Sequence, residues 1–194
     1  MEGFENNGTS NLTVEYRDPD NNLICSDTVT YTLIAAVCGR QPTPSERSTF
    51  QGWFPHPVHC EWSITAEATR AYNCIAWSVG NTEEWIWWQV DEDYGDNDGV
   101  IEISDFDAFY DAKGYQIASG LTDATIMLYQ SATAESPDNP DGITHAAKKR
   151  ACSCGAGKWT IYESKCGPAA RIEHVYNELN DHNYGAPFRY YKPK

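Results

Sequence analysis

The stretch YNCIAWSVG, residues 72–80, places an asparagine directly before a cysteine and an apolar run that ends at a glycine. Asn73 is a preferred residue type for capping a helix N-terminus, and Gly80 suits the left-handed position that ends a helix. The stretch therefore predicts a short helix with Cys74 in its first turn. A start near Thr65 is the alternative, and it would place Cys74 in the middle of a longer helix.

Cys74 has two interpretations. A cysteine beside isoleucine, alanine and tryptophan is most often a small buried apolar side chain. At a helix N-terminus, however, unpaired N–H groups and the helix dipole stabilise a thiolate, which is the form that attacks a carbonyl. A nucleophile also requires a base, which the rest of the chain must supply.

The segments that follow predict a mixture of helices and strands. The aromatic run EEWIWWQV, residues 83–90, is expected to form core or the wall of a groove. Ser104 can cap a helix of about ten residues that Gly114 ends. Strands are predicted at residues 124–130, 143–149 and 157–164, a last helix at 169–180 and a closing strand at 184–192.

The N-terminal part differs in character. Residues 1–22 are polar and rich in asparagine and aspartate, which predicts a flexible tail. Alternation over residues 26–37 indicates a strand or a short helix within an N-terminal extension, residues 23–53. We expect one domain over residues 23–194, because a 194-residue chain that is 41% hydrophobic can bury a single core.

Charge limits the partners. The formal net charge is -14, so most of the surface would repel nucleic-acid phosphates or an anionic membrane. No run of 18 apolar residues is present, and the start MEGFENNGTS lacks the basic and apolar regions of a signal peptide. Neither a nucleic-acid nor a membrane partner is expected.

The chain has seven cysteines, an odd number, so one thiol must stay unpaired or be shared. Asn7-Gly8-Thr9 and Asn11-Leu12-Thr13 fit the glycosylation pattern, and together with the cysteine content they favour a secreted protein. Three disulfides would leave Cys74 as the odd thiol if they used Cys25, Cys38, Cys60, Cys152, Cys154 and Cys166.

A base for Cys74 can be sought on the predicted strands. His145 is the one histidine inside a predicted strand, and Glu163 follows 18 residues later on what looks like the adjoining strand of a hairpin. A carboxylate there could orient the imidazole by accepting from its second nitrogen. The alternatives are a half-exposed strand histidine without a role and a solvated strand carboxylate.

Three short motifs in this order resemble those of the papain-like cysteine proteases and amidases. Cys74-Ile-Ala-Trp-Ser is similar to Cys-Trp-Ala-Phe-Ser, and Thr144-His145-Ala-Ala to Asn-His-Ala-Val. Trp159, three residues, Glu163-Ser164 and a nearby glycine are similar to the third motif, which has Asn-Ser. The resemblance covers about residues 72–167. Residues 60–78, followed by THAA at 144–147 and the segment from Trp159 to Gly167, also resemble an uncharacterised bacterial domain family.

The resemblance implies an α+β fold: a papain-like core with the nucleophile at a helix N-terminus, packed on an antiparallel sheet that carries the histidine and the glutamate. It implies a hydrolase of peptide or amide bonds that needs no cofactor. The Cys74 thiolate would attack the carbonyl and form a thioester, His145 would protonate the leaving amine and then activate water, and Glu163 would hold the imidazole.

This chain departs from the papain pattern. The distance from cysteine to histidine is much shorter, Glu163 replaces asparagine, and Ala68 stands where the oxyanion-hole glutamine belongs. The Cys74 amide with the Asn73 side chain is the substitute we expect, with Ser164 as a supporting residue. The substrate groove is expected to be lined by Trp77, Trp85, Trp88 and Trp159.

A calcium loop is an alternative for the acidic segment 96–105. With Gly99 as the obligatory glycine, Asp96, Asp98 and Asp105 fall at ligand positions, but Tyr94 stands where the first carboxylate belongs. A capped acidic turn explains the same residues, and the Cys152-Ser-Cys154 spacing is not that of a standard zinc site. We therefore expect no metal site.

A second class of function is a secreted, disulfide-containing binding module that uses its aromatic cluster for recognition. On this hypothesis Cys74 is disulfide-bonded or buried and unreactive. On the enzyme hypothesis it is a free, highly reactive thiol.

Overall fold

The computed structural model describes residues 7–17, 23–34, 39–54, 62–150, 161–175, 178–180 and 183–194. The chain divides into two compact units, Met1–Cys38 with Cys152–Lys158 and Gly39–Ala151 with Trp159–Lys194.

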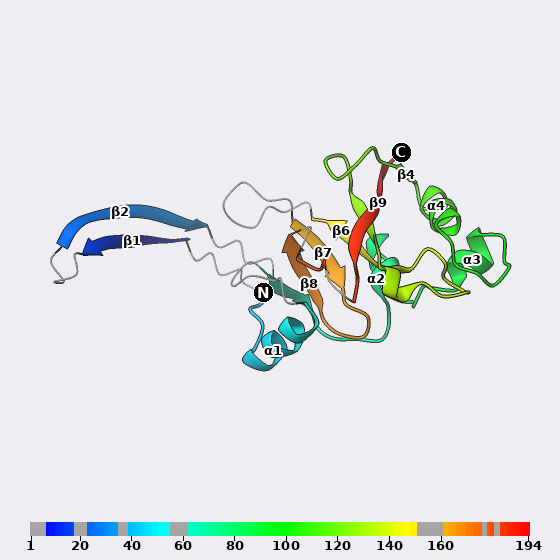
Figure 1. Cartoon of the computed structure of the whole chain (residues 1–194), viewed down its shortest axis with the longest axis horizontal. Coiled ribbons are helices and arrows are strands. Elements are labelled where there is room, and N and C mark those ends of the chain that lie inside the picture. The colour runs from blue at the N-terminus through cyan, green and yellow to red at the C-terminus, as the bar shows by residue number, and fades with distance from the viewer. Residues whose placement is uncertain are drawn as a thin grey trace. The chain divides into compact units, whose positions relative to one another are not determined.

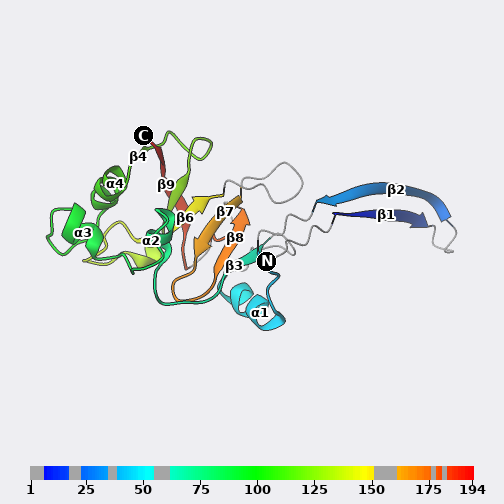
Figure 2. The same ribbon diagram turned by 180° about the vertical axis from the view of Figure 1, so that it is seen from behind.

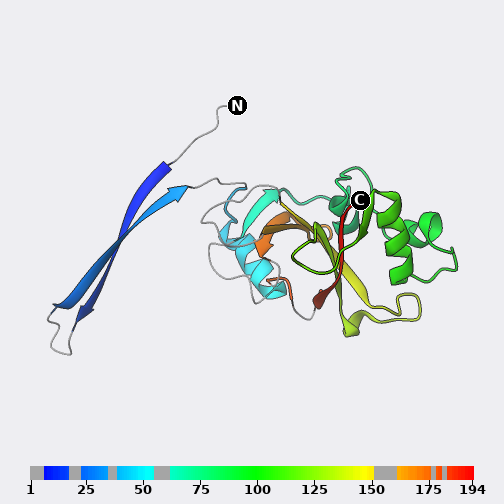
Figure 3. The ribbon, with the colours of Figure 1, turned by 90° about the horizontal axis from the view of Figure 1, so that it is seen from above.

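The first unit contains a hairpin of two long antiparallel strands, β1 (Asn7–Arg17) and β2 (Leu23–Ile34), which lie side by side in Figures 1 and 3. Residues 7–17 are thus a strand where the sequence predicted a tail, and residues 26–34 take the predicted strand option. β-branched and aromatic residues recur in both strands, and such residues favour extended backbone.

Four α-helices occur in the described part of the second unit: α1 (Pro44–Trp53), α2 (Cys74–Ser78), α3 (Gln89–Tyr94) and α4 (Ile103–Ala112). α4 confirms the predicted helix, but its cap is a reciprocal pair between Glu102 and Asp105 and not Ser104. A short 3-10 helix covers Ala132–Ala134. None of these helices is long and apolar enough to cross a lipid bilayer.

A sheet of seven strands forms the centre of this unit within the described residues, in the order β3-β8-β7-β6-β5-β9-β4 (Figure 2). Each pair of neighbours is antiparallel. Helices with an antiparallel sheet give the predicted α+β class. The strands are β3 (Ser63–Ala66), β4 (Tyr115–Ile117), β5 (Ile126–Gln130), β6 (Ile143–Lys149), β7 (Ile161–Lys165), β8 (Arg171–Val175) and β9 (Ala186–Pro193).

Strands β5, β6 and β9 confirm three of the predicted strands, and β7 confirms the described part of the fourth. The helix predicted over 169–180 is wrong, because Arg171–Val175 is strand β8 and pairs with both β3 and β7. The helix start near Thr65 is also wrong, since that residue lies in β3.

Apolar side chains form two clusters on opposite faces of the sheet, because successive residues of a strand point to opposite sides. Along β5, Ile126 and Leu128 belong to one cluster, and Met127 and Tyr129 belong to the other. The first cluster also receives buried residues of α2, α3 and α4, and we call its side the α2 face. The second includes residues of α1, and we call its side the α1 face.

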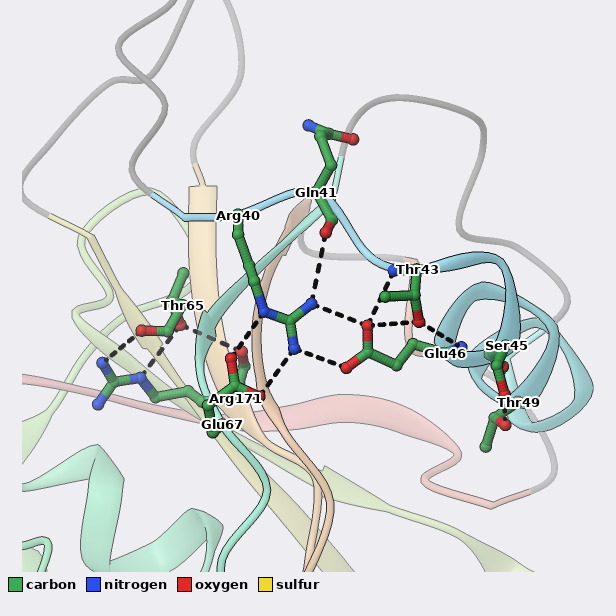
Figure 4. A network of polar contacts seen from close by, with 9 residues as sticks. All are labelled: Arg40, Gln41, Thr43, Ser45, Glu46, Thr49, Thr65, Glu67 and Arg171. Carbon is green, nitrogen blue, oxygen red and sulfur yellow. Dashed lines mark hydrogen bonds and ion pairs between the residues drawn. The ribbon is translucent and has the colours of Figure 1, made fainter. Parts of the chain in front are cut away.

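The N-terminus of α1 is tied to the end of β3 by one guanidinium group (Figure 4). Arg40 donates to both carboxylate oxygens of Glu46 and to both of Glu67, at 2.6–2.8 Å. Glu46 also accepts from the Thr43 backbone in a capping box. The ion pair with Arg40 lowers the pKa of Glu46 to about 2. α1 is thus attached to the sheet by charge as well as by its buried Phe50.

Candidate functional site

The predicted helix around Cys74 is present as α2, and Asn73 is its N-cap. The Asn73 side-chain oxygen accepts from the backbone N–H of Ala76 at 3.1 Å and of Ile86 at 3.3 Å, and its amide donates to the Ile86 carbonyl at 2.6 Å. Asn73 therefore begins the helix and joins it to the segment before α3. Gly80 has the predicted left-handed backbone, with φ of 86°.

The Cys74 thiol is free but buried in the cluster on the α2 face, with the Ala146 backbone amide among its neighbours. Burial raises its pKa to about 11, even though backbone N–H groups and the charge of Lys165 act in the opposite direction. A thiol with this pKa is protonated at neutral pH. Only 5% of the residue surface is exposed.

His145 lies on β6 and points to the other side of the sheet. Its ring stacks on Tyr184, with centroids 3.9 Å apart and an angle of 4° between the planes, and it meets the edge of Tyr129. It is completely buried, and neither ring nitrogen forms a hydrogen bond with any residue that the structure describes. Burial, and then the nearby His174, lower its pKa well below the ordinary value.

The structure therefore does not bring Cys74 and His145 together. The Cys74 thiol contacts the sheet at Ala146, on the α2 face. His145 is the residue before Ala146 in β6, and its imidazole lies on the α1 face. Adjacent residues of a strand point to opposite faces, so the predicted dyad would require a shift of one residue in β6.

Glu163 does not reach His145 either. In the pairing of β6 with β7, Glu163 stands opposite Lys148, and both side chains lie on the α2 face. Lys148 is three residues after His145. One of its oxygens lies 3.4 Å from Arg150 and 3.4 Å from Arg171. Its carboxylate therefore belongs to a group of charged residues and does not orient an imidazole.

This charged group covers the α2 face of β3, β8, β7 and β6. Arg150 also pairs with Glu173 at 3.0 Å, and Glu173 accepts from the Ser63 hydroxyl at 2.5 Å. The Arg171 guanidinium lies 3.7 Å from the centre of the Trp77 ring. These partners were not predicted from the sequence. The signal was a charged residue at every second position, at 163 and 165 and again at 171 and 173, which is the pattern of a polar strand face.

Ser164, which the sequence predicted as a supporting residue of the site, contacts His174 instead of the groups around Cys74. It is buried, and its hydroxyl lies 2.8 Å from Nε2 of His174 on the neighbouring strand. This contact stabilises the pairing of β7 with β8 on the α1 face.

The four predicted groove tryptophans have different surroundings. Trp77 is partly buried under Arg171, whereas Trp85 and Trp88 are 42% and 44% exposed in the segment that leads into α3. Trp159 lies outside the described residues. Of the three predicted groove tryptophans that the structure describes, Trp77 shares α2 with Cys74, and Trp85 and Trp88 are the exposed ones.

Of the two cysteines whose side chains the structure describes, Cys74 is free, as the three-disulfide arrangement has it, but Cys166 differs from that arrangement. Cys166 is a free, buried thiol rather than half of a disulfide, and burial raises its pKa to about 12. The side chain of Cys25 and the residues Cys38, Cys60, Cys152 and Cys154 lie outside the described parts.

The acidic loop brings together two of its three predicted carboxylates. Asp96 and Asp105 lie near each other, and the third member of the group is Asp91, in α3. Asp98 instead accepts from the backbone N–H of Val100 at 2.8 Å. Sequence reasoning missed Asp91, although it stands one helical turn before Tyr94, at which the loop pattern lacks its first carboxylate.

Residues 63–192, from the start of β3 into β9, match the family described as "Domain of unknown function (DUF7689)". The chain belongs to the DUF7689 family. The DUF7689 match includes the whole seven-stranded order of the described sheet, α2 and the acidic loop, but not α1 or the hairpin. No curated protein and no solved structure matches the chain.

Proposed function

We propose that this DUF7689 domain is a binding module that recognises a basic, Lys- or Arg-containing segment of a partner protein through Trp85 and Trp88. The observation that carries the proposal is the exposure of both indoles, 42% and 44%, within four residues of each other. Large aromatic side chains mostly pack into a core, and at interfaces they are among the residues that contribute most to binding.

Charge identifies the class of partner. Residues 71–112 contain eleven acidic residues and no lysine, arginine or histidine. Glu83, Glu84, Glu92 and Asp93 are exposed on either side of the tryptophans. A cationic side chain would gain both a cation–π contact and attraction to these carboxylates.

The surroundings of Cys74, His145 and Glu163 support a binding role over the thiol hydrolase that the papain-like motifs imply. Each of the three has neighbours of another kind: apolar residues around the thiol, tyrosine rings around the imidazole and arginines around the carboxylate. A papain-like mechanism requires the nucleophile, base and orienting group in one chain of hydrogen bonds.

We expect short peptides rich in lysine and arginine to bind, measured by fluorescence anisotropy, and peptides with glutamine at those positions not to bind. Trp85→Ala and Trp88→Ala are each expected to weaken binding by about fivefold to tenfold, the size of an exposed cation–π contact plus lost packing. Trp53→Ala is the matched control, because Trp53 is 41% exposed but lies in α1. Equal binding of the glutamine peptides, or an equal effect of Trp53→Ala, would contradict the proposal.

Iodoacetamide labelling across pH, with mass mapping of the modified site, tests the hydrolase alternative. We expect Cys74 in the folded protein to react at least tenfold more slowly than in the unfolded chain, because the buried thiol has a pKa of about 11 against about 8.5 for a free thiol. We expect His145→Ala not to change the pH dependence of this labelling, because the wild-type protein should already lack rapid labelling at low pH. Rapid labelling with a low apparent pKa that depends on His145 would favour the hydrolase instead.

A further inference from the structure

We propose that the loop between α3 and α4 binds a calcium ion through Asp91, Asp96 and Asp105. One carboxylate oxygen from each residue lies within 4.8 Å of the other two. These residues are distinct from the tryptophans and glutamates of the proposed peptide surface, so the inference does not rest on the proposed function.

A buried carboxylate oxygen without a partner is the second observation that points to a ligand. Asp91 is only 1% exposed. Its Oδ2 accepts from the Gly99 backbone N–H at 3.0 Å, but its Oδ1 is buried and accepts no hydrogen bond from any residue in the described ranges. Leaving such an atom without a donor is costly, and a cation in the centre of the three carboxylates would remove that cost.

The charge of this group is also uncompensated by the protein. No ion pair within the described part of the chain involves Asp91, Asp96 or Asp105. Burial, together with Asp91 and the nearby loop carboxylates, raises the pKa of Asp105. Three carboxylates at this separation repel one another unless a positive charge lies between them.

The backbone leaves room for the group. A Cβ atom on Gly95 would lie 2.4 Å from Oδ1 of Asp105, so only glycine allows this carboxylate to approach the end of α3. Gly99 has φ of 85° and Asn97 has φ of 56°, which gives the loop its tight left-handed turns.

The ligand chemistry favours calcium. All donors are oxygen atoms, which suit hard cations, and calcium accepts irregular geometry and varied ligand numbers, whereas magnesium requires a nearly ideal octahedron. With Gly99 at the sixth position of an EF-hand loop, Asp96 and Asp105 occupy the third and twelfth positions. Asp91 would supply the carboxylate that the first position, Tyr94, lacks.

The experiment is a titration of the full chain, first treated with a chelator, with CaCl2 and separately with MgCl2 by calorimetry, together with thermal unfolding. We expect one calcium ion per chain and a rise in Tm of about 5–10 °C when calcium exceeds Kd about 100-fold. Asp91→Asn should weaken calcium binding at least tenfold. The matched control is Asp93→Asn, an exposed residue of the same helix, which should change Kd less than twofold.

Several results would overturn the inference. One is no heat and no change in Tm at about 10 mM calcium, well above the weakest Kd of calcium modules, about 10⁻³ M. Others are tighter binding of magnesium than of calcium, or an equal loss with Asp93→Asn, which would indicate a diffuse acidic surface. If Asp91→Asn does not fold, Asp96→Asn takes its place, since Asp96 is exposed. Basic-peptide binding is scored separately, so either proposal can fail alone.

Discussion

Replacement of Lys165 by methionine is expected to lower the free energy of unfolding by about 2–4 kcal/mol. Lys165 is completely buried, and its ammonium group donates to the carbonyl oxygens of Thr69, Gly167 and Ala169 at 2.9, 2.5 and 2.6 Å. Methionine is also unbranched and only one atom shorter, but it provides no donor. Three carbonyls that connect the segment before α2 to the turn between β7 and β8 would then lose their partner, and hydrogen bonds to charged groups contribute more than neutral ones.

Chemical denaturation of Lys165→Met and of Lys192→Met gives the measurement and its control. Lys192 is 38% exposed and reaches one carboxylate at 4.0 Å, so its replacement is expected to change stability by less than about 0.5 kcal/mol. A loss below about 1 kcal/mol for Lys165→Met would show that the three carbonyls find other donors and that the ammonium group is not what stabilises this region.

The second large effect is a dependence of stability on pH that is due to His145. The unfolded chain binds a proton at this histidine below about pH 6.5, whereas the buried ring resists protonation because its pKa is lowered well below that value. Between these two pKa values the unfolded state binds more protons, so this histidine destabilises the fold as the pH falls. The unfolded-state pKa of about 6.5 limits this cost to about 2 kcal/mol at about pH 5, at about 1.36 kcal/mol per unit.

His145→Phe should remove this cost. Phenylalanine keeps a flat ring for stacking on Tyr184 and has no nitrogen that lacks a partner. Unfolding by urea at about pH 8 and about pH 5 should show that the wild-type protein loses more stability than the variant between the two, by up to about 2 kcal/mol. Parallel pH dependence in both proteins would mean that other groups carry the acid sensitivity.

Local chemistry explains what could be predicted from the sequence. The start of α2 depends on one side chain, since Asn73 bonds an amide three residues away, and that contact can be inferred from neighbouring residues alone. Strand β5 is a short apolar run, and both β5 and β6 contain strand-forming residues such as isoleucine, tyrosine and threonine, which favour extended backbone. These elements predicted a mixture of helices and strands, and the papain-like resemblance implied the α+β class.

Contacts between distant segments explain what could not be predicted. In residues 171–174 the charged Arg171 and Glu173 alternate with Ile172 and His174, but only the pairing with β3 and β7 decides that the segment is a strand. The order of the three papain-like motifs carries no information about the face to which each strand residue points. A single position separates Ala146, which lies beside Cys74, from His145, which lies on the other side of the sheet.

Asp91 shows the same limit for the acidic loop. The pattern of residues 96–105 identifies a loop with a missing ligand, but the carboxylate that fills the gap comes from the preceding helix. The position of α3 in the folded chain brings Asp91 beside the loop, and the loop pattern alone gives no sign of this contact.

The edge strands of the seven-stranded sheet, β3 and β4, affect how readily molecules of the protein aggregate at high concentration. β3 has four residues and β4 has three, and one side of β3 is already closed by the backbone pairing of Arg40 with Ile64. Exposed edges act as templates on which strands of other molecules can add, and short edges offer few unpaired N–H and C=O groups for this. The seven-stranded sheet therefore offers few edge groups to strands of other molecules, and the net charge of -14 adds mutual repulsion between molecules.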